Sequence, residues 1–263
     1  MKHIAIDPDK IRESLRTHSF GRSIHAFGTI TSTNEFARTI AQQGAVEGTL
    51  VISEEQTAGK GRLQRKWHSQ YGKGLWFSIV LRPSIKSSSV VHFPYLTSVS
   101  IAQALEKTLS LSPELKWPND LLINSKKFCG VLSEIEFHKN EINFIIIGIG
   151  INVMQDVTDF SSQTLTNATS LYIELHKYID RVNLLSEILF HFEKNYIHII
   201  ENGFSSILEE WQIRCPFIGR KIKINRDGET LNGIFRRLDN SGSLILELDD
   251  KSEMKIFAGD FNL

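Results

Sequence analysis

Apolar side chains recur at helical spacing in two long stretches of the chain. The first stretch runs through Leu96, Val99, Ala102, Leu105 and Leu109, and the second through Val182, Leu185, Leu189, Phe192, Tyr196 and Ile199. Because residues three and four apart share one face of a helix, each stretch predicts a helix with one buried face. Asp7-Pro8, and Ser32 or Thr33, are typical helix starts and predict two further helices near the N-terminus.

Short apolar runs between these helices are typical of β-strands. Residues 49–53 and 75–81 are rich in β-branched and aromatic side chains, and residues 120–153 predict three successive strands. Asn124-Ser125-Lys126 and Lys139-Asn140 are expected to form the turns between these three strands, because such polar residues favour turns. The chain up to residue 215 therefore mixes helices with strands.

The hydrophobic pattern changes after Cys215-Pro216. Residues 217–263 contain short apolar runs separated by turn signals, and they predict four or five antiparallel strands in a small barrel or sandwich. The turn signals are Asp227-Gly228, Asn240-Ser241-Gly242 and Asp249-Asp250. We expect one domain over residues 1–215 and a second over residues 216–263. The second is expected to lean on the first, because so short a module buries little core alone.

The composition is that of an ordinary globular protein. Of 263 residues, 41% are hydrophobic and 23% are charged, and 30 basic residues balance 30 acidic ones. A net charge of zero provides no overall basic field for nucleic acid or an anionic membrane, although a local basic patch stays open. No apolar run approaches the roughly 20 residues that span a bilayer, and we find no secretion signal. Cys129 and Cys215 form no C-x-x-C motif, so we expect each to be a small buried hydrophobic residue. A chain with only two cysteines fits a reducing, cytoplasmic compartment best.

Four polar segments have side chains suited to ligand binding. Residues 59–67 place two glycines beside four cations, so that backbone N–H groups and guanidinium groups can converge on a phosphate or carboxylate. Lys116 lies beside Trp117 ahead of the three strands, where its ammonium can neutralise an anion. Residues 148–153 put two glycines into a strand, which permits close approach by a ligand. Residues 31–34 offer hydroxyls and free N–H groups at a helix start.

Each segment also has a purely structural interpretation, which the sequence leaves open. The basic segment can be a solvated turn, residues 116–120 a tight turn, residues 148–153 a core strand and residues 31–34 a helix cap. Several known motifs are absent. The chain has neither P-loop spacing nor a Rossmann fingerprint nor a G-x-S-x-G elbow, and its histidines and cysteines lack zinc-site spacing. No metal-binding site made by protein ligands is expected.

Taken together and in order, these segments resemble the biotin protein ligase family. The matching elements are Thr31-Ser32-Thr33-Asn34, Gln56 to Trp67, Lys116-Trp117-Pro118-Asn119-Asp120, Gly130-Val131-Leu132-Ser133-Glu134 and Gly148 to Val153. The family's basic loop usually reads G-R-G-R-x-G-R, whereas this chain has Lys60 at the first arginine and Gln64 at the third glycine. Lysine lacks the guanidinium fork and glutamine lacks glycine's φ freedom, so the kinetics of loop closure are expected to differ.

The resemblance implies an α+β fold. Its catalytic domain would combine a mixed or antiparallel sheet with helices, and a small SH3-like β-barrel would follow at the C-terminus. It further implies an enzyme, biotin–[acetyl-CoA-carboxylase] ligase, with ATP and biotin as substrates and Mg²⁺ carried on the ATP phosphates. Biotin would be activated as biotinyl-5′-AMP and then transferred to a lysine of a biotin carboxyl carrier protein. A closed loop would exclude the water that hydrolyses the anhydride.

The resemblance also assigns roles to residues. Lys116 and Arg62 are implied as catalytic, because they neutralise the biotin carboxylate and the α-phosphate. The residues implied for biotin are Ser32, Thr33, Asn34, Gln56, Lys60, Gly61, Arg62, Lys116, Gly148 and Gly150. Those implied for ATP are Lys60, Arg62, Arg65, Trp67, Asn119 and Asn152. Small polar side chains suit the ureido ring of biotin, which has one carbonyl and two N–H groups.

Two other functions stay open: a lipoate or octanoate protein ligase, and a biotin-binding regulator without turnover. The basic loop together with residues 116–120 favours the biotin branch, and an intact Lys116 and Arg62 favour turnover. Only 31 residues precede Ser32, too few for a winged helix, so we expect a monofunctional form with no sequence-specific DNA binding. We expect no membrane contact. The sequence leaves open whether the protein is a monomer or a weak homodimer.

Overall fold

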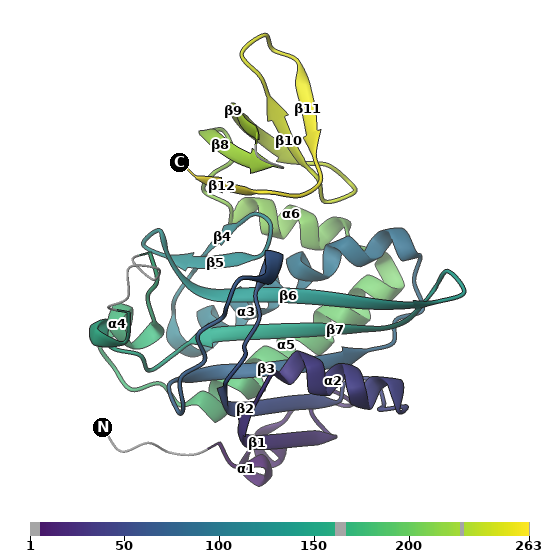
Figure 1. Ribbon diagram of the computed structural model, residues 1–263, viewed down its shortest axis with the longest axis vertical. Helices are drawn as coiled ribbons and strands as arrows, with labels where there is room; N and C mark the ends of the chain where they lie inside the picture. The colour runs from purple at the N-terminus through teal and green to yellow at the C-terminus, as the bar shows by residue number, and fades with distance from the viewer. Residues whose placement is uncertain (1–5, 161–166, 227–228, 263) are drawn as a thin grey trace.

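The structure is a computed structural model that describes residues 6–160, 167–226 and 229–262 (Figure 1). Its first seven strands are β1 (Ile24–Ile30), β2 (Leu50–Gln56), β3 (Gly74–Leu81), β4 (Glu114–Lys116), β5 (Asp120–Ile123), β6 (Lys126–His138) and β7 (Glu141–Asn152). The last five are β8 (Lys221–Arg226), β9 (Glu229–Leu238), β10 (Leu244–Glu247), β11 (Glu253–Ile256) and β12 (Asp260–Asn262). The helices are α1 (Pro8–Ser14), α2 (Thr33–Gln42), α3 (Phe93–Leu109), α4 (Leu171–Leu175), α5 (Arg181–Asn202) and α6 (Ser205–Ile213), with 3-10 turns η1 (Arg62–Gln64), η2 (Ser87–His92) and η3 (Val157–Phe160).

The strands form two sheets. The larger sheet has the order β1-β2-β3-β7-β6-β5-β4, and the C-terminal sheet has the order β11-β10-β9-β8-β12. Among the described strands, β1 and β2 pair in parallel, and all other neighbours pair antiparallel. The expected α+β fold, with a mixed sheet followed by a small antiparallel β unit, is confirmed.

Most of the elements predicted from the hydrophobic pattern are present. Asp7 caps α1 through its side chain, and the two long apolar stripes form α3 and α5. The predicted turn residues Asn124 and Asn140 have φ angles of 50° and 68°, the left-handed conformation that tight hairpin turns use. The predicted turn at Asp227-Gly228 lies outside the described residues.

The central strands β2, β3 and β7 of the larger sheet are buried on both faces. Side chains alternate between these two faces along each strand. Leu50 and Ile52 of β2 join the main core, whereas Val51 between them packs with Ala37 and Ala41 beneath α2. The same alternation holds in β7, whose even-numbered side chains face α2. Helix α2 therefore covers one face of the sheet, and α3 and α5 cover the other (Figure 1).

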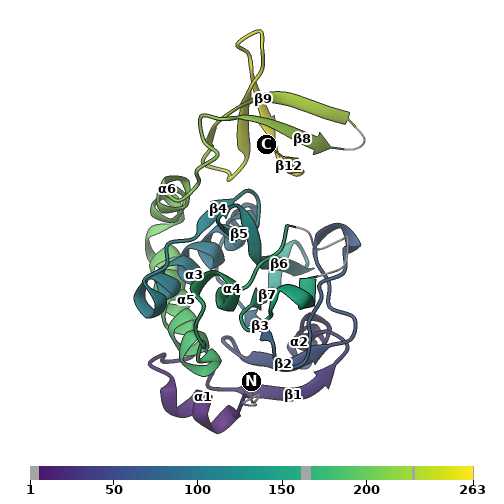
Figure 2. The ribbon, with the colours of Figure 1, turned by 90° about the vertical axis from the view of Figure 1, so that its left-hand side faces the viewer.

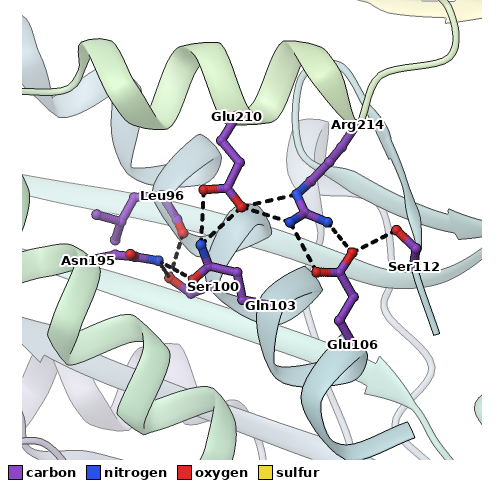
Figure 3. A network of polar contacts seen from close by, with 8 residues as sticks. All are labelled: Leu96, Ser100, Gln103, Glu106, Ser112, Asn195, Glu210 and Arg214. Atoms are coloured by element: carbon purple, nitrogen blue, oxygen red, sulfur yellow. Dashed lines mark hydrogen bonds and ion pairs between the residues drawn. The ribbon is translucent and has the colours of Figure 1, made fainter. Parts of the chain in front are cut away.

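A network of polar contacts joins α3, α5 and α6 (Figure 3). Arg214, just after α6, forms ion pairs with Glu106 of α3 and Glu210 of α6 at 2.5 and 2.8 Å. Its backbone oxygen accepts the Leu115 N–H at 3.0 Å, which ties the end of α6 to β4. A boundary near residue 216 stays a proposal, supported by the turn between α6 and β8.

Two further sequence-based expectations concern cysteines and membranes. Cys129 and Cys215 are both free and buried, as expected for small hydrophobes. Burial raises the pKa of Cys129 well above its usual range and that of Cys215 to about 12, so both thiols stay protonated at neutral pH. Within the described part of the chain, we find no helix that combines the length and apolar character needed to cross a membrane.

Candidate active site

A cavity of about 400 Å³ lies on the α2 face of the larger sheet. It is next to the N-terminal end of α2, beyond the part of the sheet that this helix covers. Its walls come from the start of α2, the basic loop (residues 59–67), the turn after β4, the middle of β6 and β7, and β12 of the C-terminal sheet. Every residue that the sequence assigned to biotin or ATP lines this cavity: Ser32, Thr33, Asn34, Gln56, Lys60, Gly61, Arg62, Arg65, Trp67, Lys116, Asn119, Gly148, Gly150 and Asn152.

The start of α2 supplies a buried cluster of small polar groups. Thr33 donates its backbone N–H and its hydroxyl to Gln56 Oε1 at 2.8 and 3.0 Å, and Gln56 Nε2 donates to Ser69 at 2.9 Å. The Asn34 carboxamide accepts from Ser78 at 2.6 Å and donates to Glu134 at 2.7 Å. These bonds fix the orientation of each side chain before a ligand arrives.

Ser32 differs from its neighbours in this cluster. It occupies the N-cap position of α2, as predicted, but its side chain makes no capping hydrogen bond. Its hydroxyl has no hydrogen-bond partner among the described residues, although the residue is only 1% exposed. A hydroxyl that lines a cavity and has no protein partner is available to a ligand.

The two glycines of β7 allow side chains to lie against the strand. A Cβ atom on Gly148 would lie 2.1 Å from Asn34 Oδ1, and one on Gly150 would lie 2.3 Å from Trp67 Nε1. The strand glycines are thus required for close approach by the Asn34 and Trp67 side chains. Close approach by a ligand, which the sequence predicted, stays a prediction. The Trp67 indole N–H is buried without an acceptor among the described residues.

The basic loop is held in place by the C-terminal sheet. Arg62 pairs with Asp260 of β12 at 3.1 Å and donates to Asn119 Oδ1 at 3.1 Å, and Arg65 pairs with the same Asp260 at 2.6 Å. Lys60 instead pairs with Glu35 of α2 at 2.5 Å, and this hydrogen bond raises the pKa of Lys60. The loop thus places Lys60 near α2 and both Arg62 and Arg65 near β12, and all three residues line the cavity.

Lys116 ends β4 and lines the cavity near Asp260, the carboxylate that also pairs with the basic loop. Burial is the main cause that lowers the pKa of Lys116, and Lys127 adds to that effect. The carboxylates of Asp120 and Asp260 oppose it. Lys127 pairs with Asp120 at 2.6 Å and lies 5.3 Å from the Trp67 ring centroid. The site therefore places the carboxylates of Asp120 and Asp260 among several cations.

Two asparagines support the cavity walls. Asn119 donates to the Val131 backbone oxygen at 2.6 Å and accepts from Arg62, so it links the basic loop to β6. Asn152 donates to the Thr169 backbone oxygen at 3.0 Å and accepts from Gln155 at 3.0 Å. Much of the hydrogen-bonding capacity of both carboxamides is used inside the protein, and direct contact with a nucleotide stays a prediction.

Four charged residues of the cavity wall had no role assigned from the sequence: Asp120, Lys127, Asp159 and Asp260. Asp120 and Lys127 belong to β5 and β6, where strand patterns say nothing of a cavity, and Asp260 is almost 200 positions from Arg62 in the chain. The resemblance quoted Asp120 within a motif without giving it a role. No local signal marks Asp260, because its part in the site depends on how the two sheets pack.

Two family models match the chain. Residues 26–152 match the biotin/lipoate A/B protein ligase family, and residues 217–263 match the biotin protein ligase C terminal domain. The bifunctional ligase/repressor BirA of Bacillus subtilis is 36% identical over 262 residues, which cover 98% of this chain and 79% of that protein. A biotin–[acetyl-CoA-carboxylase] ligase of Mycobacterium tuberculosis is 26% identical over 97% of this chain and 94% of that protein.

Solved structures agree with these matches. The biotin protein ligase of Aquifex aeolicus, solved in complex with biotin and ATP, superposes with a TM-score of 0.78 at 28% identity. The superposition covers 92% of this chain and 98% of that one. Both the larger sheet and the C-terminal sheet thus have counterparts in one known enzyme structure. The chain is a member of the biotin/lipoate A/B protein ligase family, in the branch of biotin protein ligases that carry the C-terminal domain.

Proposed function

We propose that this protein is a biotin–[acetyl-CoA-carboxylase] ligase, which activates biotin with ATP and transfers it to a lysine of a biotin carboxyl carrier protein. One observation carries the proposal: a single cavity collects all the residues that the family motifs assign to biotin and ATP. The family match and the likeness to a ligase solved with biotin and ATP support the same reading.

In the first reaction, a biotin carboxylate oxygen attacks the α-phosphorus of ATP, and the bond to pyrophosphate breaks. Both reactants are anions, so the protein must neutralise charge and hold the two groups in line. Lys116 and Arg62 both line the cavity, and both lie near the carboxylate of Asp260. We assign both as catalytic residues that stabilise the negative charge around the α-phosphate.

Biotin binding is assigned to the polar cluster at the start of α2. The ureido ring presents one acceptor and two donors. The hydroxyl of Ser32, without a partner among the described residues, can donate to the ureido oxygen. Thr33, Asn34 and Gln56 are already oriented by their mutual bonds and add further polar contacts.

ATP binding is assigned to the basic loop with Trp67, Asn119 and Asn152. Arg62 and Arg65 are paired with Asp260 in the structure. The more highly charged triphosphate would draw these guanidinium groups away from that carboxylate. Closure of the loop over the adenylate would then exclude water from the anhydride.

Mg²⁺ is expected to travel on the ATP phosphates. The acidic side chains that line the cavity are Asp120, Asp159 and Asp260, and each is paired with a lysine or arginine. Among the described residues, no group of three or more His, Cys, Asp and Glu side chains is arranged to hold an ion. This donor set fits an ion whose ligands come mainly from phosphate and water.

In the second reaction, the amine of the carrier lysine attacks the carbonyl carbon of biotinyl-5′-AMP. The bond to AMP breaks, and an amide forms with loss of the amine proton. No covalent bond to the enzyme is needed at either step. This explains how the site can act without a nucleophilic serine or cysteine, since positioning and charge neutralisation carry the chemistry.

The test is to incubate the protein with ATP, Mg²⁺, biotin and a carrier domain, and to measure the mass of the carrier. We expect the mass increase of one biotinyl group. A parallel reaction with lipoate or octanoate tests the main alternative, and biotin-dependent pyrophosphate release tests a binding protein without turnover. Modification by lipoate in preference to biotin, or binding without pyrophosphate release, would overturn the proposal.

We further propose a cytoplasmic enzyme that does not bind DNA in a sequence-specific way and is a monomer or a weak homodimer. The two free buried cysteines support the cytoplasmic assignment. The net charge of zero supports the absence of strong DNA binding. Sedimentation at several protein concentrations would distinguish the two oligomeric states.

A further inference from the structure

The Lys116 ammonium lies over an aromatic ring that comes from the other sheet. Its Nζ is 5.0 Å from the centroid of the Phe261 ring. Lys116 is the last residue of β4, and Phe261 is the central residue of β12. Figure 2 shows the C-terminal sheet standing above the edge of the larger sheet that carries β4 and β5. This distance is within the roughly 6 Å at which a ring face attracts a cation.

The Phe261 ring is packed inside the C-terminal sheet. The residue is 1% exposed, and its backbone pairs with Ile224 of β8. Two other rings pack against it edge-on, Phe217 at 5.2 Å and Phe235 at 6.1 Å. The packing of the C-terminal sheet thus presents the face of the Phe261 ring to the Lys116 ammonium.

Lys116 needs such support because its position is costly for a charge. Burial favours the neutral amine, and the cation of Lys127 acts in the same direction. Two carboxylates favour the ammonium, Asp120 of β5 and Asp260 of β12. Both are shared with other cations, since Lys127 pairs with Asp120 and the basic loop pairs with Asp260. The face of Phe261 is a source of negative potential that hydrogen-bonding cations do not compete for.

We propose that Phe261 is a positioning residue, whose ring face holds the Lys116 ammonium charged and directed into the cavity. The proposal rests on the function proposed above and adds a task for the C-terminal sheet within it. Because the ring attracts the ammonium and not the neutral amine, its effect depends on the protonation of Lys116. A residue that only filled space would lack this dependence.

The test compares variants at Phe261 with matched variants at Phe235, which lies in the same aromatic cluster and is 0% exposed. Phe261→Leu removes the ring and keeps an apolar side chain. Replacement of Phe261 by 3,4,5-trifluorophenylalanine keeps the ring and its packing but weakens the negative potential of its face. The same two changes at Phe235 report the cost of disturbing the core.

The readout is biotin-dependent exchange of pyrophosphate into ATP, measured across pH. The usual strength of cation–π contacts corresponds to a fall in kcat of about 2- to 30-fold for Phe261→Leu, with a smaller fall for the fluorinated ring. Losing the ring also favours the neutral amine, so the alkaline loss of activity should move to lower pH. The Phe235 variants should keep the wild-type pH profile.

The outcomes separate the two proposals. If the wild-type protein shows no biotin-dependent exchange, the proposed function fails. If it is active but the Phe261 variants keep the wild-type pH profile, or the Phe235 variants match them in rate and pH profile, the positioning role of Phe261 is wrong. If Phe261→Leu fails to fold, the fluorinated ring still decides, because it preserves shape.

Discussion

At the scale of single residues, Lys116 should contribute most to the first reaction. We expect Lys116→Ala to fold but to slow biotinyl-5′-AMP formation by about 100- to 1000-fold, the usual cost of removing one group that stabilises developing charge. Pyrophosphate release measures the effect. Lys107→Ala, an exposed lysine on α3, is the control and should match the wild type. A Lys116 variant that retains most of its activity would contradict the assignment.

Residues that a local motif marks were predictable from the sequence, and residues that only packing brings to the site were not. Gly148 and Gly150 stand out because glycine is unusual inside a strand. Asp260 and Phe261 look like ordinary members of a short strand, and their contacts to Arg62 and Lys116 arise only when the two sheets meet.

Adding a single methyl group at Gly148 should lower both the stability of the protein and its affinity for biotin. Its Cβ would lie 2.1 Å from Asn34 Oδ1, so Gly148→Ala must displace the Asn34 carboxamide. We expect a loss of stability of about 1–3 kcal/mol, typical of overpacking, together with a higher KM for biotin. Gly28→Ala on β1 is the control, since no atom lies within 4 Å of a Cβ there. Denaturation and biotin titration measure the two effects, and equal behaviour of both variants would refute this account of Gly148.

At the scale of elements, length and packing decided which could be predicted. The long stripes of α3 and α5 and the apolar runs of β3 and β7 carry enough periodic positions to be recognised. Strand β4 has three residues and is held by backbone bonds to β5 and Arg214, which leave no periodic pattern. Strand β1 lies at the sheet edge with no fully buried residue, and Gln64 takes a φ of 59° without being glycine. Such features depend on tertiary context.

The basic loop should respond to ligands. Its turn is closed by Gly61 N–H to Arg65 O at 2.7 Å and Trp67 N–H to Gly59 O at 2.9 Å. Two of its arginines pair with Asp260. The cations of the loop repel one another when no anionic ligand is bound, and this repulsion should loosen the loop. Trypsin should therefore cut the loop readily without ligand and slowly with biotin and ATP. Cleavage after Lys139, in the β6–β7 turn, is the internal control. Equal cleavage of the loop in both conditions would count against ligand-induced closure.

The turn between β9 and β10 is joined to the start of α3 by a histidine that should make stability depend on pH. Both ring nitrogens of His92 lie 3.1 Å from backbone oxygens, one of Ser89 and one of Asn240 in that turn. Burial is the largest effect and lowers the pKa of His92, although these oxygens and Asp239 oppose it. The folded protein therefore binds this proton less readily than the unfolded chain does.

The stabilisation from His92 is accordingly present above the ordinary histidine pKa and is lost as pH falls through it. Between about pH 7.5 and pH 5.5, the free energy of unfolding should fall less steeply in His92→Gln than in the wild type, by at most about 1.4 kcal/mol per pH unit for one proton. Urea denaturation measures the slopes. His198→Gln, an exposed histidine on α5, is the control, and identical slopes for His92→Gln and the wild type would exclude this role.

At the scale of the whole molecule, the two sheets build one site. The larger sheet supplies the floor of the cavity, and the start of α2 beside it supplies the polar cluster assigned to biotin. Strand β12 supplies the carboxylate that holds Arg62 and Arg65 and the ring beneath Lys116. Relative movement of the sheets would separate these groups. The contact of His92 with Asn240 thus stabilises the geometry of the site as well as the junction between the sheets.

Charge across the whole molecule leads to the last prediction. Two neighbouring arginines of β9 in the C-terminal sheet are both paired with carboxylates, Arg236 with Glu247 at 2.8 Å and Arg237 with Glu253 at 2.6 Å. With these cations neutralised and a net charge of zero, the protein should not distinguish one DNA duplex from a scrambled competitor in a gel shift at physiological salt. Glu247→Gln with Glu253→Gln frees both arginines and should give weak binding that disappears as salt is raised, because phosphate contacts release counterions. A sequence-specific shift by the wild-type protein would overturn the proposed absence of DNA binding, and unchanged behaviour of the double variant would show that pairing is not what limits it.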